Sequence, residues 1–166
     1  MKGNPMRPLE FLLRTNRSIG PTLLRWGLAL VIFPHAAQKM LGWFGGGGFS
    51  GTMHFFTSNM HIPAPLAFLA ILTEFLGVIG LALGLFTRVA ALGIGFVLLV
   101  AAVLVHLQHG FFMNWAGKQA GEGFEYHLLV MAMAIVLVIH GGGSAALDSI
   151  LLRRAAGVPP APKDEF

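Results

Sequence analysis

The stretch PLAFLAILTEFLGVIGLALGLF, residues 65–86, decides the fold of this chain. It is long enough to cross a bilayer, because a helix that spans the hydrocarbon needs about 20 mostly apolar residues. A single charged residue, Glu74, interrupts the stretch near its middle. An ionised carboxylate at that depth costs about 2.5 to 3.5 kcal/mol on insertion scales, so it has to be paired, protonated or functional. We therefore expect another part of the chain to supply a partner for Glu74.

The composition of the whole chain is that of a membrane protein. Of its 166 residues, 55% are hydrophobic and 11% are charged, whereas about 25% of the residues of a typical soluble domain are charged. Lipid offers the backbone no hydrogen-bond partners, so every membrane span should be a helix. The prediction is an all-α polytopic membrane protein, an antiparallel bundle of transmembrane helices within a domain of residues 1–150. Four apolar stretches are long enough to be its spans: residues 22–41, 66–86, 88–108 and 124–142.

The basic residues are distributed unevenly about these spans. Two of the 11 Lys and Arg residues, Lys39 and Lys118, lie toward one side of the membrane. The other nine lie toward the opposite side: Lys2, Arg7, Arg14, Arg17, Arg25, Arg88, Arg153, Arg154 and Lys163. The positive-inside rule then places both termini in the cytoplasm. We expect the chain to lie in the plasma or inner membrane of the cell. Because these residues flank apolar segments, the lipid bilayer is the expected partner, and nucleic acid is not.

The segments outside the spans have their own signals. Residues 9–20 mix leucine with arginine, as an interfacial helix does, and residues 144–154 predict a second such helix with Ser144 as its cap. The glycine-rich residues 42–65 predict a flexible loop that aromatic side chains anchor to the interface. Residues 151–166 read as a basic and then disordered cytoplasmic tail.

Polar residues gather in the outer half of all four predicted spans. His35, Gln38 and Lys39 share one face of the first helix, because they are spaced three and four residues apart. Lys39 has a stem long enough to reach Glu74. We predict a pocket here, lined by Lys39, Glu74, His35, His106, His109 and Glu125. The predicted catalytic residues are Glu74, Lys39, His35 and His109. The predicted ligand-binding residues are Gln38, His106, Glu125 and His127.

A second group of residues has predicted structural roles. Gly77, Gly80 and Gly84 give the second helix a face of small residues on which another helix can pack closely. Arg25 should anchor the inner end of the first helix, with Asp148 as a candidate partner, and Arg88 lies in the short cytoplasmic turn.

Four motifs in the same order resemble the DoxX family of small four-helix membrane proteins. They are LLRWGLALVIFPHAAQKMLGWFGG, TEFLGVIGLALGLFTR, the HGFF that closes the third span, and GFEYHLLVMAMAIVLVIHGGGSAALD. The family pattern falls on Arg25, His35, Lys39, Glu74, Gly77, Gly80, Arg88, His109, Glu125 and Asp148. Its C-terminal motif usually reads Gly-x-Gly-x-x-Ser-Leu-Asp, whereas this chain has GGGSAALD. The resemblance implies membrane redox physiology, since the family includes a subunit of a thiosulfate:quinone oxidoreductase and members linked to oxidative stress.

Three functions fit these residues. The first is a quinone-interacting component of a redox system, acting alone or as the membrane subunit of an oxidoreductase. Because the chain has no cysteine, such a role needs a borrowed cofactor. The second is a noncatalytic scaffold that holds soluble redox or oxidative-stress enzymes at the membrane. A sister membrane subunit and a second copy of the chain are further candidate partners. The third, less favoured because the spacing matches no strong motif, is a haem or metal site made by His35, His106, His109 and His127. The quinone is the only cofactor that we predict.

Overall fold

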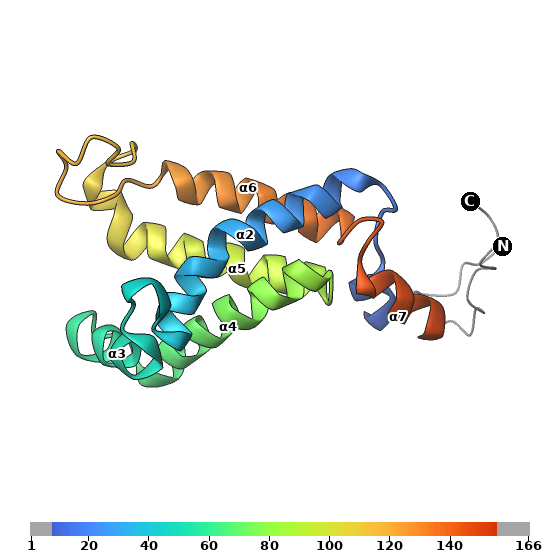
Figure 1. The fold of residues 1–166 in the computed structure, drawn as a ribbon, viewed down its shortest axis with the longest axis horizontal. Coiled ribbons are helices and arrows are strands. Elements are labelled where there is room, and N and C mark those ends of the chain that lie inside the picture. Colours follow the sequence, from blue (N-terminus) through green and yellow to red (C-terminus); the bar gives the residue numbers. More distant parts are fainter. Residues whose placement is uncertain (1–7, 156–166) are drawn as a thin grey trace.

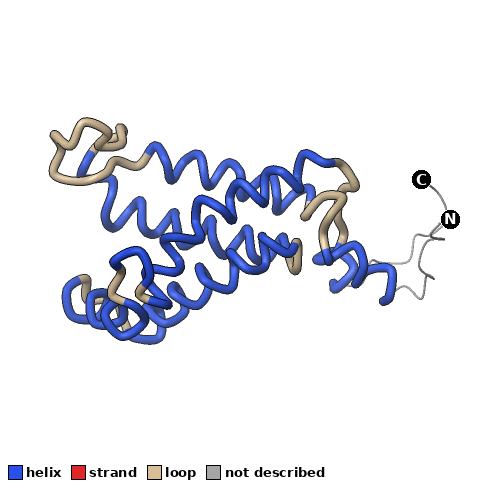
Figure 2. Tube along the Cα trace, viewed as in Figure 1, coloured by secondary structure: helices blue, strands red, loops and turns tan. Residues whose placement is uncertain are grey.

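The computed structural model describes residues 8–155, and within them every regular element is helical (Figure 2). The all-α prediction is therefore confirmed. Four long helices form the body of the molecule: α2 (Ile19–Leu41), α4 (Ala64–Leu83), α5 (Thr87–Ala101) and α6 (Glu125–His140). The short helices are α1 (Pro8–Leu13), α3 (Gly48–His54) and α7 (Leu147–Ala155). Single turns of 3-10 helix form η1 (Trp43–Gly45) and η4 (Leu107–His109), and π-helix forms η2 (Phe55–Asn59) and η3 (Ala102–His106).

The long helices run alternately in opposite directions (Figure 1). α2 and α5 each pack against both α4 and α6, which encloses a core of aliphatic side chains such as Leu28, Ile94 and Leu137. The predicted role of the glycines in packing is confirmed between α4 and α5. A Cβ atom on Gly77 would lie 2.9 Å from Cγ1 of Ile94, and one on Gly80 would lie 3.1 Å from Cβ of Ala90. The absence of side chains therefore brings these two helices into close contact.

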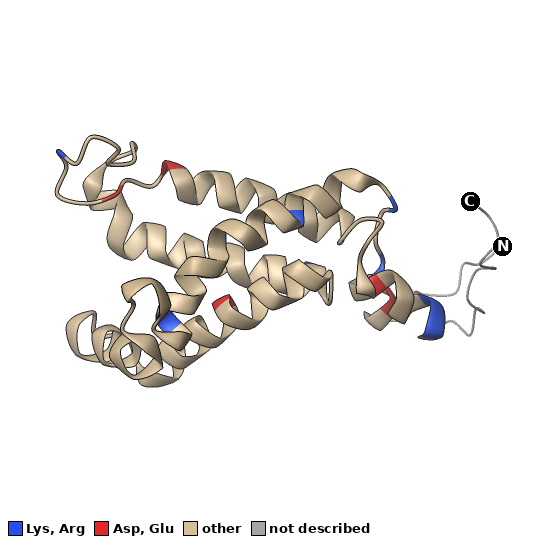
Figure 3. Ribbon diagram, viewed as in Figure 1, with Lys and Arg blue, Asp and Glu red and all other residues tan. Residues whose placement is uncertain are grey.

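The outer surface of the bundle is apolar. Phe96, for example, is 64% exposed, and Leu30 is 75% exposed. Figure 3 shows few charged positions along the long helices and several Lys and Arg positions at the end near α7. Among the described residues, α4 and the continuous helix Thr87–His109 are long and apolar enough to cross a membrane, and α6 is apolar but shorter. An apolar surface of this extent is unusual for a soluble monomer and suits a lipid environment.

The glycine-rich segment differs from its prediction. Residues 42–65 are not a flexible loop, because η1, α3 and η2 fold the segment back against α2 and α4. Gly42, with φ of 75°, ends α2 in the left-handed conformation. Gly46 lies so close to the backbone of Gln38 that any Cβ atom would collide with it. These glycines thus serve close packing, whereas composition alone indicated only freedom of the backbone.

The two predicted interfacial segments are shorter than expected. α1 ends at Leu13, and residues 14–18 that follow it are not helical. α7 begins at Leu147, so Ser144 does not cap it and instead donates its backbone N–H to the Ser18 carbonyl. Residues 151–155, assigned to the tail, belong to α7. Lys2, Arg7, Lys163 and the remainder of the predicted disordered tail lie outside the described residues.

Candidate functional site

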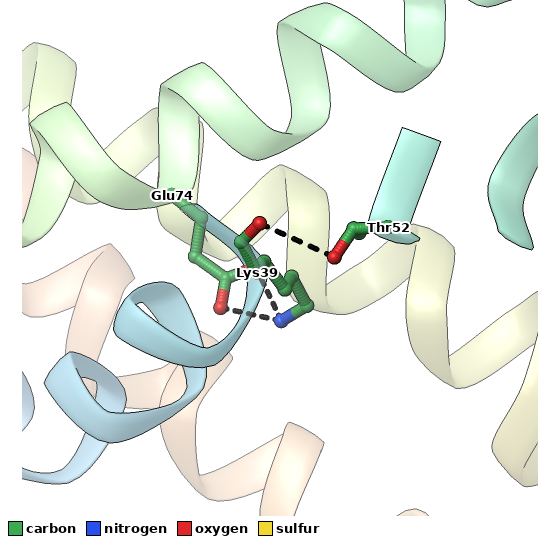
Figure 4. A network of polar contacts seen from close by, with 3 residues as sticks. All are labelled: Lys39, Thr52 and Glu74. Atoms are coloured by element: carbon green, nitrogen blue, oxygen red, sulfur yellow. Dashed lines mark hydrogen bonds and ion pairs between the residues drawn. The ribbon is translucent and has the colours of Figure 1, made fainter. Parts of the chain in front are cut away.

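Lys39, near the end of α2, and Glu74 of α4 form an ion pair between the two helices (Figure 4). The Lys39 Nζ atom lies 2.6 Å from Oε1 and 2.8 Å from Oε2 of Glu74. The expected partner of Glu74 is thus confirmed. The Glu74 side chain is 4% exposed and that of Lys39 is 31% exposed, so the carboxylate is enclosed while the ammonium borders open space. Two of the three N–H groups of the ammonium bind Glu74, and the third is left for another acceptor.

That open space is a cavity of about 360 Å³ between the helices. It lies at the end of the bundle where α2 and α5 finish and α4 and α6 begin, which we call the cavity end. Aliphatic and aromatic side chains make most of its wall: Ile32, Phe55, Phe56, Met60, Ile62, Ala70, Val97, Leu98, Val100, Ala101, Leu104, Val105 and Met113. Its volume is within the range of about 300 to 1,000 Å³ that small-molecule sites occupy.

Polar groups form one side of the cavity. His35, His106, Glu122, Tyr126 and His127 line it in addition to the ion pair. The ring centroids of His106 and His127 lie 4.1 Å apart with the ring planes tilted by 40°, and the ring centroid of Tyr126 lies 6.4 Å from that of His35. His106 Nδ1 lies 2.9 Å from the backbone carbonyl oxygen of Glu122. His127, by contrast, is 4% exposed, and its Nδ1 has no hydrogen-bond partner among the described residues. The buried Tyr126 hydroxyl also has none there.

Both π-helical segments border this cavity. Phe55 and Phe56 come from η2, and Leu104 and His106 come from η3. A π turn admits an extra residue into a helix and changes the direction of the side chains that follow, and such turns are frequent at functional sites. In η3 the backbone N–H of Leu107 donates to the carbonyl of Ala102, which sets the direction in which His106 points. The π turn of η3, which continues α5, thus supplies His106 to the polar side of the cavity.

The sequence profile of the DoxX family matches residues 20–107, more than half of the chain. The chain belongs to the DoxX family. It is accordingly a membrane protein that contacts the lipid bilayer. No curated protein and no solved structure matches it. The DoxX match includes the ion pair and His35 and ends before α6, so Tyr126 and His127 lie beyond it.

Three predicted site residues of this DoxX chain do not line the cavity. Gln38 donates from Nε2 to the Phe44 carbonyl, 3.1 Å away, and so holds η1 against α2. The carboxylate of Glu125 accepts the backbone N–H of Met113 at 2.9 Å, which pins the α5–α6 loop. The imidazole of His109 packs against Gly121, where a Cβ atom would lie 2.5 Å from its Nε2. We correct the predicted pocket by removing His109 and Glu125 from its lining.

Sequence reasoning did not select Tyr126 for the site. It is the only tyrosine of the chain and directly precedes His127, and these two facts were the available signal. The four histidines proposed as haem or metal ligands also separate, because His109 faces the loop while the other three line the cavity. Among residues 8–155, no group of three or more His, Asp or Glu side chains has the geometry of a metal site.

The opposite end of the bundle, here called the arginine end, has Arg25 at its centre. The Arg25 side chain donates to the carbonyls of Leu81, Ala82, Gly142 and Ala145 at distances of 2.6 to 2.8 Å. The candidate pairing with Asp148 is corrected in part, because Arg25 and Asp148 attract each other but form no direct ion pair within the described residues. Gly84, which ends α4 with φ of 67°, lies so close that a Cβ atom would be 3.0 Å from Cζ of Arg25.

Asp148 of α7 fixes the start of α5 instead. Its carboxylate oxygens accept the backbone N–H groups of Phe86 and Thr87 at 2.6 and 2.9 Å. Burial raises the pKa of the Asp148 carboxyl, while the two N–H donors and nearby Arg25 act in the opposite direction. Arg88 donates to the Val138 and Arg14 carbonyls. The predicted structural residues at this end all take part in contacts between segments far apart in the sequence.

Proposed function

We propose that this DoxX protein binds a quinone in its cavity and acts as the membrane component of a redox system. One observation carries the proposal. The Tyr126 hydroxyl and His127 Nδ1 are buried beside an apolar cavity without a partner among the described residues. A buried polar group without a partner costs about 1 to 3 kcal/mol, so such groups call for a ligand or ordered water. A quinone has an apolar ring with two carbonyl acceptors, which matches this division of the cavity wall.

The roles of the polar residues follow from their contacts. The third N–H of Lys39 and the Tyr126 hydroxyl are donors for the two quinone carbonyls. His127 is a third donor in the tautomer that has its proton on Nδ1. Glu74 and His35 lie beside Lys39 and exchange protons with the outer surface as the bound ligand changes its redox state. The electrons come from a soluble redox enzyme or a sister subunit, and this oxidoreductase partner is part of the proposal.

We further propose that α2, α4, α5 and α6 all cross the membrane and that both termini are cytoplasmic. The apolar surface of the bundle supports this arrangement, as does the excess of Lys and Arg at the arginine end. The shorter α6 reaches across because the ordered loop before it continues toward the outer surface. This orientation puts the cavity end outside the cytoplasm in the plasma or inner membrane.

A binding measurement tests the quinone proposal. Purified protein in detergent is titrated with a decyl-tailed 1,4-benzoquinone, and saturable binding is expected. The variant with Glu74→Gln and Lys39→Met should lose about tenfold in affinity, because it removes a charged donor from the cavity. His127→Gln should also weaken binding, while His109→Gln is the matched control from the same end and should not. Unchanged affinity in the double variant would remove the proposed site.

The scaffold alternative makes a different prediction. Partners would then depend on the cytoplasmic segments, and Glu74→Gln would leave the cellular phenotype intact. Co-purification of partner enzymes with the intact protein and with a variant lacking residues after 151 distinguishes the two. Loss of partners with an unchanged Glu74→Gln phenotype would favour the scaffold over the quinone site.

A further inference from the structure

A second cavity, of about 450 Å³, lies at the arginine end and has no part in the proposed quinone site. Arg14 and Arg88 line it, together with His140 at the end of α6. Phe11 of α1 and Ile139 of α6 complete the apolar part of its wall. It is thus formed where the segment after α1 meets the start of α5 and the end of α6.

Charge in this second cavity is positive. Two guanidinium groups line it, and no carboxylate is among the side chains found to line it in the described part of the chain. Glu10 lies one helical turn before Arg14, and the carboxylate of Asp148 attracts Arg88 from α7. The charge of Arg14 acts against that of Arg88, and an anion between the two guanidinium groups would relieve this repulsion.

The guanidinium of Arg88 is held in place by the backbone. Its Nε and Nη2 donate to the Arg14 carbonyl at 3.2 and 3.1 Å, and its Nη1 donates to the Val138 carbonyl at 2.7 Å. The ring of Phe11 lies 4.8 Å from Cζ of Arg88. A guanidinium has five N–H groups, so these contacts leave two for an anion. The bonds therefore orient Arg88 as a fixed donor and do not exhaust it.

The apolar wall gives this site an amphiphilic character. Phe11 is 52% exposed and Ile139 is 60% exposed on the outer surface of the bundle. A free inorganic anion would gain nothing from them. A lipid would place its phosphate on the arginines and its glycerol and acyl groups along Phe11 and Ile139.

We propose that this second cavity binds the phosphate of an anionic phospholipid headgroup. Arginine suits this role because its planar fork of donors matches phosphate oxygens. His140 borders the same cavity and offers its second ring nitrogen, since Nδ1 lies 3.0 Å from the Val136 carbonyl oxygen. The site is independent of the quinone proposal and of any partner enzyme.

Native mass spectrometry of the full chain tests the proposal. Delipidated protein is incubated with phosphatidylglycerol or with phosphatidylcholine, and the occupancy of bound lipid is measured. Phosphatidylglycerol should be retained in preference to phosphatidylcholine. Arg14→Gln should reduce its occupancy about fivefold, as expected for the loss of one basic contact at an anionic lipid. This change leaves the Arg14 carbonyl, and hence the position of Arg88, in place.

Two controls make the result decisive. Arg154→Gln, an exposed arginine on α7 at the same end, should leave lipid occupancy unchanged. Arg88→Gln should match or exceed the loss in Arg14→Gln, with thermal unfolding showing that each variant is folded. Excess inorganic phosphate that displaces the lipid would show that the site recognises the free anion and overturn the lipid assignment. Equal retention of both lipids, or an equal loss in Arg154→Gln, would refute the site itself.

Discussion

The buried charges at the two ends of the bundle have different kinds of partner. At the arginine end, Arg25 donates to four backbone carbonyls and Asp148 accepts two backbone N–H groups. At the cavity end, Lys39 and Glu74 bind each other beside open space. Polar atoms of Tyr126 and His127 there have no partner within the described residues.

The difference separates a structural device from a binding site. A charge whose donors all reach backbone groups ties segments together and has little capacity left for a ligand. A charge that shares its surroundings with a cavity and with unpaired polar atoms is prepared for a further molecule. Arg25 and Asp148 should therefore govern stability, and the cavity end should govern binding of the quinone.

Arg25→Met should have the largest effect on folding. Four carbonyls would lose a charged donor, although those of Leu81, Ala82 and Gly142 each keep a second donor. A hydrogen bond to a charged group contributes about 1.5 to 3 kcal/mol. We expect the free energy of unfolding to fall by more than about 4 kcal/mol, measured by denaturant titration of the solubilised protein. Arg154→Met, on the exposed part of α7, is the control and should change it by less than about 0.5 kcal/mol. Similar losses in the two variants would show that Arg25 does not hold the segments of the arginine end together.

The ion pair should show coupling in a double-mutant cycle. Glu74→Leu leaves the Lys39 ammonium without its partner, and we expect a loss of about 2 to 3 kcal/mol. This is below the roughly 3 to 5 kcal/mol that is usual for a broken buried pair, because Lys39 is partly exposed to the cavity. Adding Lys39→Met should restore part of that loss. Strictly additive losses in thermal unfolding would mean that the two charges are not coupled.

Asp148→Asn should have an intermediate effect. The amide retains one oxygen for the backbone N–H groups of Phe86 and Thr87, but it loses the charge and presents a donor to the second N–H. The expected loss in unfolding free energy is about 1 to 2 kcal/mol. Ser149→Ala, at the next position of α7, provides a comparison at the same helix end. A smaller loss at Asp148 than at Ser149 would argue against its role at the start of α5.

Tyr126→Phe should separate stability from binding. The hydroxyl has no partner among the described residues, so its removal should change the unfolding free energy by less than about 1 kcal/mol. Affinity for the decyl-tailed benzoquinone should fall about fivefold, the size expected for one hydrogen bond. A large change in stability with no change in affinity would reverse the assignment of roles to the two ends.

The sequence predicted the helices and the ion pair well. When η3 and η4 are counted as the continuation of α5, the long helices begin and end within a few residues of the predicted spans. Each apolar stretch ends at glycine, proline or polar residues. Glu74 needed a partner at its depth, and the face shared by His35 and Lys39 identified it. The sequence did not predict that Arg25 and Asp148 would bond to the backbone. The carbonyl and N–H groups that they bind belong to turns far away in the sequence.

The polar wall was only partly predictable for a related reason. His106 and His109 are three residues apart, which in a regular α-helix places them on one face. The π and 3-10 turns at η3 and η4 break that spacing, so His106 lines the cavity while His109 packs on Gly121. Likewise, the run of glycines indicated flexibility, whereas close contact with the Gln38 backbone is what requires Gly46.

The π turn at η3 also makes this chain sensitive to length at one particular place. Deleting a single residue from Ala102–His106 would let the segment return to ordinary α-helix without breaking any loop. Every side chain beyond the deletion would then rotate by about 100° about the helix axis. The imidazole of His106 would leave the ring of His127, although its chemistry and its neighbours in the sequence would be unaltered. At this position, a change in the number of residues would therefore alter the cavity in a way that substitution of a single residue would not.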